Sequence, residues 1–138
     1  MKDRQSYEWF EHKHRLLWGH NIAIERKDKE QAFKELEGEL STIRKRLTTP
    51  LQRESFDLAV RMRCFACGGM LLKTRILITD SCTECPVDWQ NPTNYCLKTD
   101  SYYEQYYNAV SKSRRVTVKC ARIAKKISKL RWKKWEEK

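Results

Sequence analysis

Apolar side chains recur every three or four residues along the first third of the chain, which is the spacing of helices with one buried face. The pattern predicts a helix over Asp3–Trp18 that ends at Gly19, and a second helix over Asp28–Leu47. The second helix has heptad spacing, which suits packing against another helix. The predicted buried residues are Tyr7, Phe10, His14 and Leu17 in the first helix and Phe33, Leu36, Leu40, Ile43 and Leu47 in the second.

Turn and cap residues follow the second helix. Thr49 is suited to cap a helix N-terminus, so a short helix is predicted over Pro50–Arg63, with proline in its first position. The adjacent Gly68-Gly69 pair indicates a turn, because glycine tolerates positive φ. Leu and Ile are frequent in Met70–Thr79, and this segment is predicted to form a small β-hairpin.

The last quarter of the chain returns to helical spacing. Ser101 and Glu104 match a capping box, and beyond them apolar or small residues alternate in steps of four and three. This pattern predicts one long helix over Tyr102–Trp135, about 50 Å in length at 1.5 Å per residue. The β-branched run Val116-Thr117-Val118 is its weak point, where a bend or break is expected.

Cysteine spacing adds a candidate metal site. Cys64 and Cys67 form one Cys-x-x-Cys pair, Cys82 and Cys85 form another, and fourteen residues separate the pairs. Two such pairs are typical of a structural Zn²⁺ site with four thiolates, which leaves no coordination position open for catalysis. Cys96 follows closely and is held in reserve as a replacement ligand. The pattern therefore predicts one structural zinc ion.

Other interpretations of the cysteines remain open at this point. They include buried structural thiols, redox-active cysteines and an iron–sulfur cluster. Cys120 lies on the apolar seam of the long predicted helix and is expected to be a core residue. No signal-peptide core and no run of about 18 apolar residues is present. A cytoplasmic location is therefore expected, where clustered cysteines indicate metal binding more than disulfides.

These elements predict a mainly α fold in a single domain, residues 1–138. It is a helical bundle with N-terminal helices (1–63), a zinc-stapled knuckle and β-hairpin insertion (64–100) and a long basic helix (101–138). The chain is 40% apolar and 34% charged, so its core is expected to be thin. A metal ion or a second copy of the chain is expected to support such a core, and a homodimer is one possibility.

The cysteine pattern resembles that of small bacteriophage proteins with a zinc knuckle, over about residues 64–110. The resemblance implies a phage origin and a zinc knuckle, and it carries over no catalytic residue. By analogy it also implies action in the host-cell cytoplasm against host machinery, such as a nucleic-acid-guided defence complex. The residues that carry it are Cys64-Phe65-Ala66-Cys67, Cys82-Thr83-Glu84-Cys85-Pro86, Trp89 and Cys96.

Charge is concentrated at the end of the chain. The formal net charge is +11, and residues 111–138 contain twelve Lys or Arg and two Glu. On the long predicted helix six of these cations form a stripe that spans about 27 Å. Such a stripe indicates sequence-independent binding to nucleic acid phosphates. The predicted stripe consists of Arg115, Lys119, Arg122, Lys126, Lys129 and Lys133.

Trp132 and Trp135 lie near the end of the stripe, where they either stack on bases or cover the core. Three other roles of the stripe stay open: a solvated helix face, an anionic membrane surface, or an acidic protein partner.

The leading functional hypothesis is a non-enzymatic, zinc-containing protein that binds nucleic acid or a host nucleoprotein. The first alternative is an anti-CRISPR-like inhibitor that acts through protein contacts. The second is a small zinc-stapled nuclease, which requires histidines close to the cysteine pairs. His12 and His14 do not share a helix face, and no histidine follows His20. No catalytic residue is therefore assigned.

Overall fold

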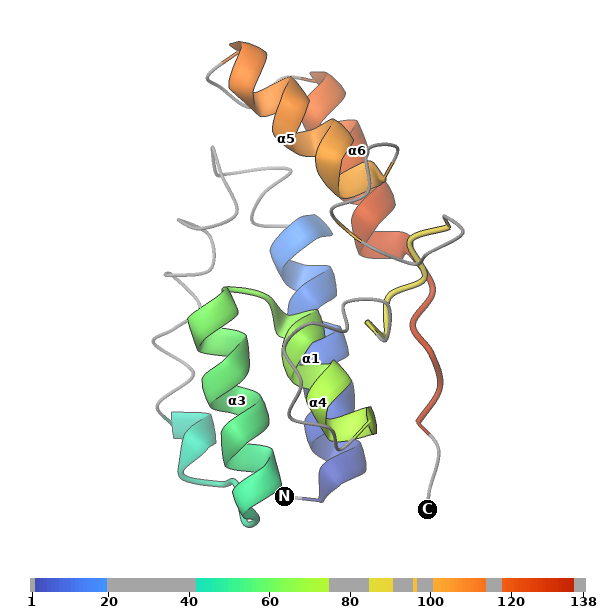
Figure 1. The fold of residues 1–138 in the computed structure, drawn as a ribbon. Coiled ribbons are helices and arrows are strands. Elements are labelled where there is room, and N and C mark those ends of the chain that lie inside the picture. The colour runs from blue at the N-terminus through green and yellow to red at the C-terminus, as the bar shows by residue number, and fades with distance from the viewer. Residues whose placement is uncertain are drawn as a thin grey trace.

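The computed structural model of the chain describes residues 2–19, 42–74, 85–90, 96, 101–113 and 118–135, with the backbone alone for 111–113. The described residues are mainly helical, as predicted (Figure 1). The β pairing found among these described residues is one isolated antiparallel bridge between Val87 and Trp132. The helices are α1 (Asp3–Leu16), α3 (Pro50–Met62), α4 (Phe65–Thr74), α5 (Tyr102–Ser113) and α6 (Val118–Lys129).

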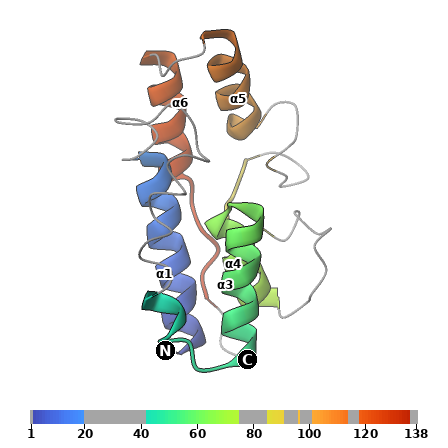
Figure 2. The same cartoon turned by 90° about the vertical axis from the view of Figure 1, so that its left-hand side faces the viewer.

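The described helices form two groups. In the first, α4 packs against both α1 and α3. In the second, α5 and α6 lie side by side at one end of that group (Figures 1 and 2). After α6 the chain continues in the same direction beside α1 as an extended segment, residues 130–135, here called the strap (Figure 1). The strap joins the two groups, because it continues from α6 and contacts α1.

Helix α1 confirms the first predicted helix and its buried face. Tyr7, Phe10, His14 and Leu17 are all buried. The Tyr7 and His14 rings pack edge to face on Trp132 of the strap, at centroid distances of 5.6 Å and 5.3 Å. The spacing of apolar residues was enough to predict this buried face, because the apolar residues of an amphipathic helix recur with the helical period.

Helix α3 begins as its cap residues predict. The Thr49 side chain accepts a hydrogen bond from the Gln52 amide at 3.2 Å, and Pro50 occupies the first helical position. The buried Gln52 side chain also donates to Asp3 at 2.8 Å. This bond ties the start of α3 to the start of α1.

The predicted β-hairpin over Met70–Thr79 is wrong for Met70–Thr74, which belong to helix α4, and 75–79 lie outside the described residues. Helix α4 is buried along most of its length because it contacts α1 and α3. A helix buried all round has an apolar run without a clear period, and such a run resembles a strand in the sequence.

The Gly68-Gly69 pair is helical and does not form the predicted turn, and neither residue has positive φ. A Cβ atom on Gly68 would lie 2.7 Å from the Phe10 ring and 2.9 Å from the Ser55 carbonyl oxygen. Glycine is therefore needed at 68 for the close approach of α4 to its neighbours and not for its conformational freedom.

The single long helix predicted over Tyr102–Trp135 is also wrong. It is divided into α5 and α6, which run antiparallel and pack on each other (Figures 1 and 2). Ser101 caps its start as predicted, because the Glu104 amide donates to the Ser101 hydroxyl at 3.2 Å. The break falls at the predicted weak point, and folding back lets the apolar faces of the two halves bury each other.

The second predicted helix, Asp28–Leu47, lies mostly outside the described residues. Of its seam, Ile43 and Leu47 are described, and both pack on the core. Its predicted partnership with the C-terminal seam stays a prediction.

Candidate metal centre and basic surface

The turn between α3 and α4 positions the first cysteine pair. Helix α3 ends in a Schellman motif: Arg63 has left-handed backbone angles, and the Cys64 amide donates to the Ala59 carbonyl at 3.0 Å. Cys64 then directly precedes α4, and the Cys67 amide donates to its carbonyl at 3.2 Å. Cys64 and Cys67 are three residues apart and therefore lie on the same side of the first turn of α4.

The third cysteine, Cys85, is held by pairing with the strap. The Asp88 amide donates to the Arg131 carbonyl, and the Lys133 amide donates to the Pro86 carbonyl, both at 2.8 Å. These bonds flank the bridge between Val87 and Trp132. Cys85 is buried at the beginning of this paired segment.

The fourth described cysteine near these segments is Cys96, six residues before α5 begins at Tyr102. The Ser101 hydroxyl donates a hydrogen bond to the Cys96 carbonyl and accepts one from the Glu104 amide. Ser101 is itself buried. The residue that caps α5 therefore also fixes the backbone at Cys96.

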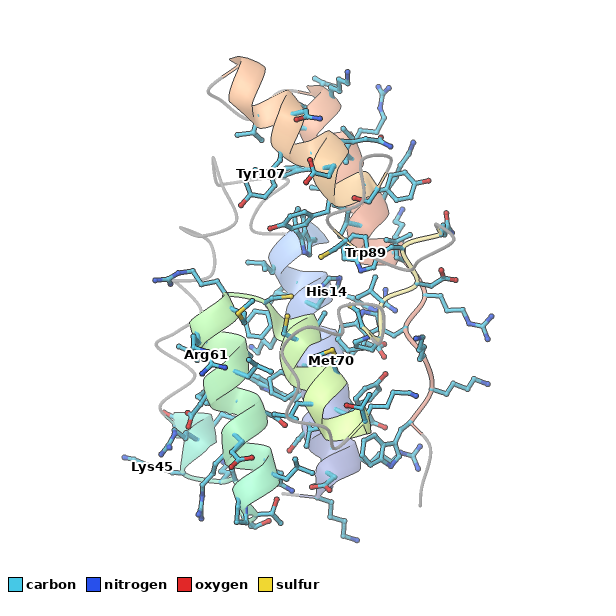
Figure 3. All side chains as sticks on the ribbon, viewed as in Figure 1. His14, Lys45, Arg61, Met70, Trp89 and Tyr107 are labelled. Atoms are coloured by element: carbon cyan, nitrogen blue, oxygen red, sulfur yellow. The ribbon has the colours of Figure 1, made fainter. Side chains whose placement is uncertain are left out.

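The three segments meet at one cavity of about 140 Å³, here called the sulfur-lined cavity. Figure 3 shows sulfur atoms, in yellow, gathered where α3 and α4 approach the labelled His14 and Trp89. Four of its ten lining residues are cysteines, which is why it is a candidate metal centre. The cavity is lined by His14, Trp18, Met62, Cys64, Cys67, Met70, Cys85, Trp89, Cys96 and Tyr103.

Burial controls the protonation of Cys85. It raises the pKa of the Cys85 thiol to about 12, and negative charge on Cys64 adds to the increase. Interactions with the Trp89 side chain and the Val87 backbone act in the opposite direction, and Cys96 adds a further increase. Without a cation Cys85 is therefore a neutral thiol, and a bound metal ion is the kind of partner that stabilises a buried thiolate.

The donor chemistry of the cavity fits Zn²⁺, which binds cysteine thiolates in tetrahedral sites. In the described part of the chain, however, no three His, Cys, Asp or Glu side chains are close enough together to hold a metal ion as they stand. Cys82, one of the four predicted ligands, lies outside the described residues. The structure therefore brings Cys64, Cys67 and Cys85 to one cavity and adds Cys96, which the sequence offered as a reserve.

The remaining cysteine and histidine predictions have clear outcomes. Cys120 is fully buried in the core on α6, as predicted. His12 is exposed, whereas His14 is buried with its ring 5.3 Å from that of Trp132. The sequence did not indicate that His14 also lines the sulfur-lined cavity, because that proximity depends on how α1 packs.

Five of the six predicted binding cations lie on α6 or the strap with exposed or half-buried side chains, and four of these lie on the helix itself. Lys119, Arg122, Lys126 and Lys129 are exposed on α6, Lys133 is half-buried on the strap, and Arg115 lies outside the described residues. Lys125, which the predicted stripe omitted, is exposed beside them. The basic face of α6 is defined as Lys119, Arg122, Lys125, Lys126 and Lys129.

The basic face contains no carboxylate, since Val118–Lys129 has no Asp or Glu. Within the described residues none of its five cations forms an ion pair, although the Lys126 ammonium lies 5.9 Å from the centre of the Tyr102 ring. Exposed Arg131 and Lys134 extend the positive charge onto the strap.

The two tryptophans near the predicted stripe pack on the protein. Trp132 is 4% exposed, so of its two suggested roles the structure shows the covering of the core. Trp135 is half-buried, with its ring 5.4 Å from Tyr7. The strap is held further by a hydrogen bond from the Tyr7 hydroxyl to the Lys133 carbonyl.

Comparison of the chain with models of known families, with curated proteins and with solved structures gave no match. None of the described helices has the length and apolar content that a membrane crossing needs.

Proposed function

We propose that this protein is a non-enzymatic binding protein that contacts nucleic acid through the basic face of α6. The observation that carries the proposal is the charge of that face: five exposed or accessible cations on one helix of twelve residues, with no carboxylate among them. A helix face that serves only solubility usually mixes both signs of charge.

The dimensions of the basic face suit a polyanion. From Lys119 to Lys129 it extends about 15 Å, a length over which duplex DNA carries several phosphates. Arg131 and Lys134 continue the charge beyond the helix end. Because Trp132 is buried, the proposed contact is to phosphates and not to stacked bases, so it carries no sequence preference.

One structural Zn²⁺ in the sulfur-lined cavity is part of the proposal. Four thiolates would leave no open position on the metal, so its role would be to hold segments together. Support comes from the position of Cys85, whose segment is hydrogen-bonded to the strap that follows α6. A reducing cytoplasm would keep the thiols available for the metal.

The test measures affinity for labelled duplex DNA and single-stranded RNA over a series of salt concentrations. The double variant Arg122→Ala/Lys129→Ala removes one Arg and one Lys, seven residues apart on the same face of α6. If both touch phosphates, the log–log salt slope for duplex DNA falls by about 1.8, or about 0.9 per contact.

The matched control is Lys45→Ala/Arg61→Ala, which removes the same charges from the exposed α3 side of the molecule (Figure 3). Its salt slope should equal that of the parent. The proposal fails if the parent binds neither nucleic acid at low salt, or if both double variants change the slope equally. Capture of a protein from a nuclease-treated lysate, without nucleic acid affinity, would favour the protein-inhibitor alternative instead.

A further inference from the structure

Four cysteines line the sulfur-lined cavity, although their side chains are not yet close enough together to hold a metal ion as they stand. Structural zinc is almost always four-coordinate. Cys64 and Cys67 come from the α3–α4 turn, Cys85 from the segment paired with the strap, and Cys96 from a position six residues before α5. Four sulfurs from three segments therefore line one space of about 140 Å³.

We propose that Cys96, and not Cys82, is the fourth thiolate of the zinc centre, together with Cys64, Cys67 and Cys85. This inference rests on the zinc in the proposed function. It replaces the second local Cys-x-x-Cys pair by a long-range pair, because ten residues separate Cys85 from Cys96.

The backbone around Cys96 is fixed in a way that suits a ligand. Its carbonyl accepts a hydrogen bond from buried Ser101, which caps α5. Tyr103, two residues after Ser101, lines the cavity. Its ring packs edge to face on Trp89, with ring centroids 6.1 Å apart. Trp89 belongs to the segment that begins with Cys85. The ring contact therefore joins the two segments that supply the third and fourth sulfurs.

His14 is the other side chain on the cavity wall with a donor for zinc. Its ring packs edge to face on Trp132, and Trp132 packs in the same way on Tyr7. This places His14 within an aromatic cluster of the core, so we assign it no metal bond.

A zinc centre of this composition would connect the two helix groups. Cys64 and Cys67 belong to the α3–α4 side, and the Cys96 carbonyl is hydrogen-bonded to Ser101, the residue that caps α5. A knuckle completed by Cys82 would instead take its last two ligands from one short stretch of chain. The two arrangements therefore differ in which single substitution removes the metal.

The experiment uses the full chain, purified under reducing conditions, with zinc content measured and Co²⁺ substituted for absorption spectroscopy. The variants are Cys82→Ser, Cys96→Ser and, as a buried cysteine outside the cavity, Cys120→Ser. We expect one zinc per parent chain and four cobalt-bound thiolates. Cys96→Ser should lower metal affinity by more than about 100-fold, since changes to residues outside the ligand set already cost 10- to 100-fold.

Cys82→Ser and Cys120→Ser should keep the four-thiolate cobalt spectrum. Because loss of the metal also removes its contribution to folding, Cys96→His supplies a second measurement that does not depend on losing the metal. It should retain the metal with a spectrum of three sulfurs and one nitrogen, whereas histidine at a position that is not a ligand would leave four sulfurs.

The inference is overturned if Cys82→Ser loses the metal to the same extent as Cys96→Ser or more, while the parent still holds zinc. It is also overturned if Cys96→His retains a four-sulfur spectrum. A parent chain that binds no zinc would instead overturn the zinc centre of the proposed function, so the two failures are distinguishable.

Discussion

The two helix groups use their charged residues differently. On and beside the α1–α3–α4 group, three arginines pair with carboxylates: Arg4 with Glu8 at 3.1 Å, Arg15 with Glu11 at 3.3 Å and Arg44 with Asp57 at 3.2 Å. Helix α6 has five cations and no carboxylate. Exposed pairs such as those of the first group add little stability, typically below about 1 kcal/mol. The comparison teaches that, among the described helices, α6 carries cations without carboxylates on the same helix to balance them.

The two groups also differ in how they reach close packing. In the first group a glycine lets helices approach, since a Cβ on Gly68 would clash with Phe10. In the second, apolar side chains of α6 such as Ile123 and Ile127 fill the interior. Contacts between the groups include a hydrogen bond of 2.6 Å from the Arg15 guanidinium to the Ser128 carbonyl. This bond satisfies one of the last carbonyls of α6, which lack partners within the helix.

The largest effect is expected from a charge placed inside the second group. Ile123→Asp puts a carboxylate at a position that is 7% exposed, so stability should fall by more than about 4 kcal/mol. Val118→Asp is the matched control on the same helix, at 76% exposure, and should change stability by less than about 0.5 kcal/mol. Urea unfolding measures both, and equal losses would contradict the assignment of Ile123 to the core.

An intermediate effect on stability is expected from adding a methyl group where the helices of the first group pack most closely. Gly68→Ala should cost about 1–3 kcal/mol through overpacking against Phe10 and the Ser55 carbonyl. Gly69→Ala should cost less, because its nearest neighbour is the Trp132 ring at 3.0 Å. Both changes gain the same helix propensity, so the difference between them in thermal or urea unfolding isolates the steric term. A larger loss for Gly69→Ala would show that α4 approaches its neighbours differently.

The smallest effect is expected at the link between the groups. Tyr7→Phe removes the hydrogen bond to the Lys133 carbonyl, and stability at pH 7 should fall by about 1 kcal/mol.

The same variant should change the response to alkali. Burial, followed by the charges of Glu11 and Cys85, raises the pKa of Tyr7 in the folded protein. Above pH of about 10 the unfolded tyrosine loses its proton while the folded one keeps it, so stability falls as pH rises. Unfolding measured from pH 8 to 11 should therefore show a shallower decline for Tyr7→Phe than for the parent. An equal decline would mean that Tyr7 is not the group responsible.

Local signals allowed much of the fold to be predicted. Thr49, Pro50 and Ser101 set helix ends through contacts within a few residues, and the period of α1 identified its buried face. Such features depend on neighbouring residues in the chain, which the sequence displays directly. The mainly α class followed from them.

The errors arose where distant segments decide the structure. Helix α4 was mistaken for a hairpin because its apolar run has no clear period when two helices cover it. The long C-terminal helix was predicted because its seam is continuous, and only tertiary contact shows that its two halves pack on each other.

Of the candidate site, too, the sequence predicted the part set by local spacing and missed the part set by tertiary contacts. The sequence grouped Cys64, Cys67 and Cys85 by spacing, and they do share a cavity. Cys96 entered only as a reserve, because its position depends on where α5 begins. The burial of Trp132 was equally hidden, since it results from the strap packing on α1.

The contact between Tyr7 and Lys133 joins residues that are 126 positions apart. During synthesis α1 is made before Trp132, which covers its aromatic face. Tyr7 and His14 therefore stay uncovered by the strap on the ribosome until residue 132 has been added. Closing so long a loop carries an entropic cost that grows slowly with length, about 0.6 kcal/mol per doubling. Shielding of α1 is thus a late event, and a nascent chain that stalls before residue 132 would present its aromatic face to chaperones.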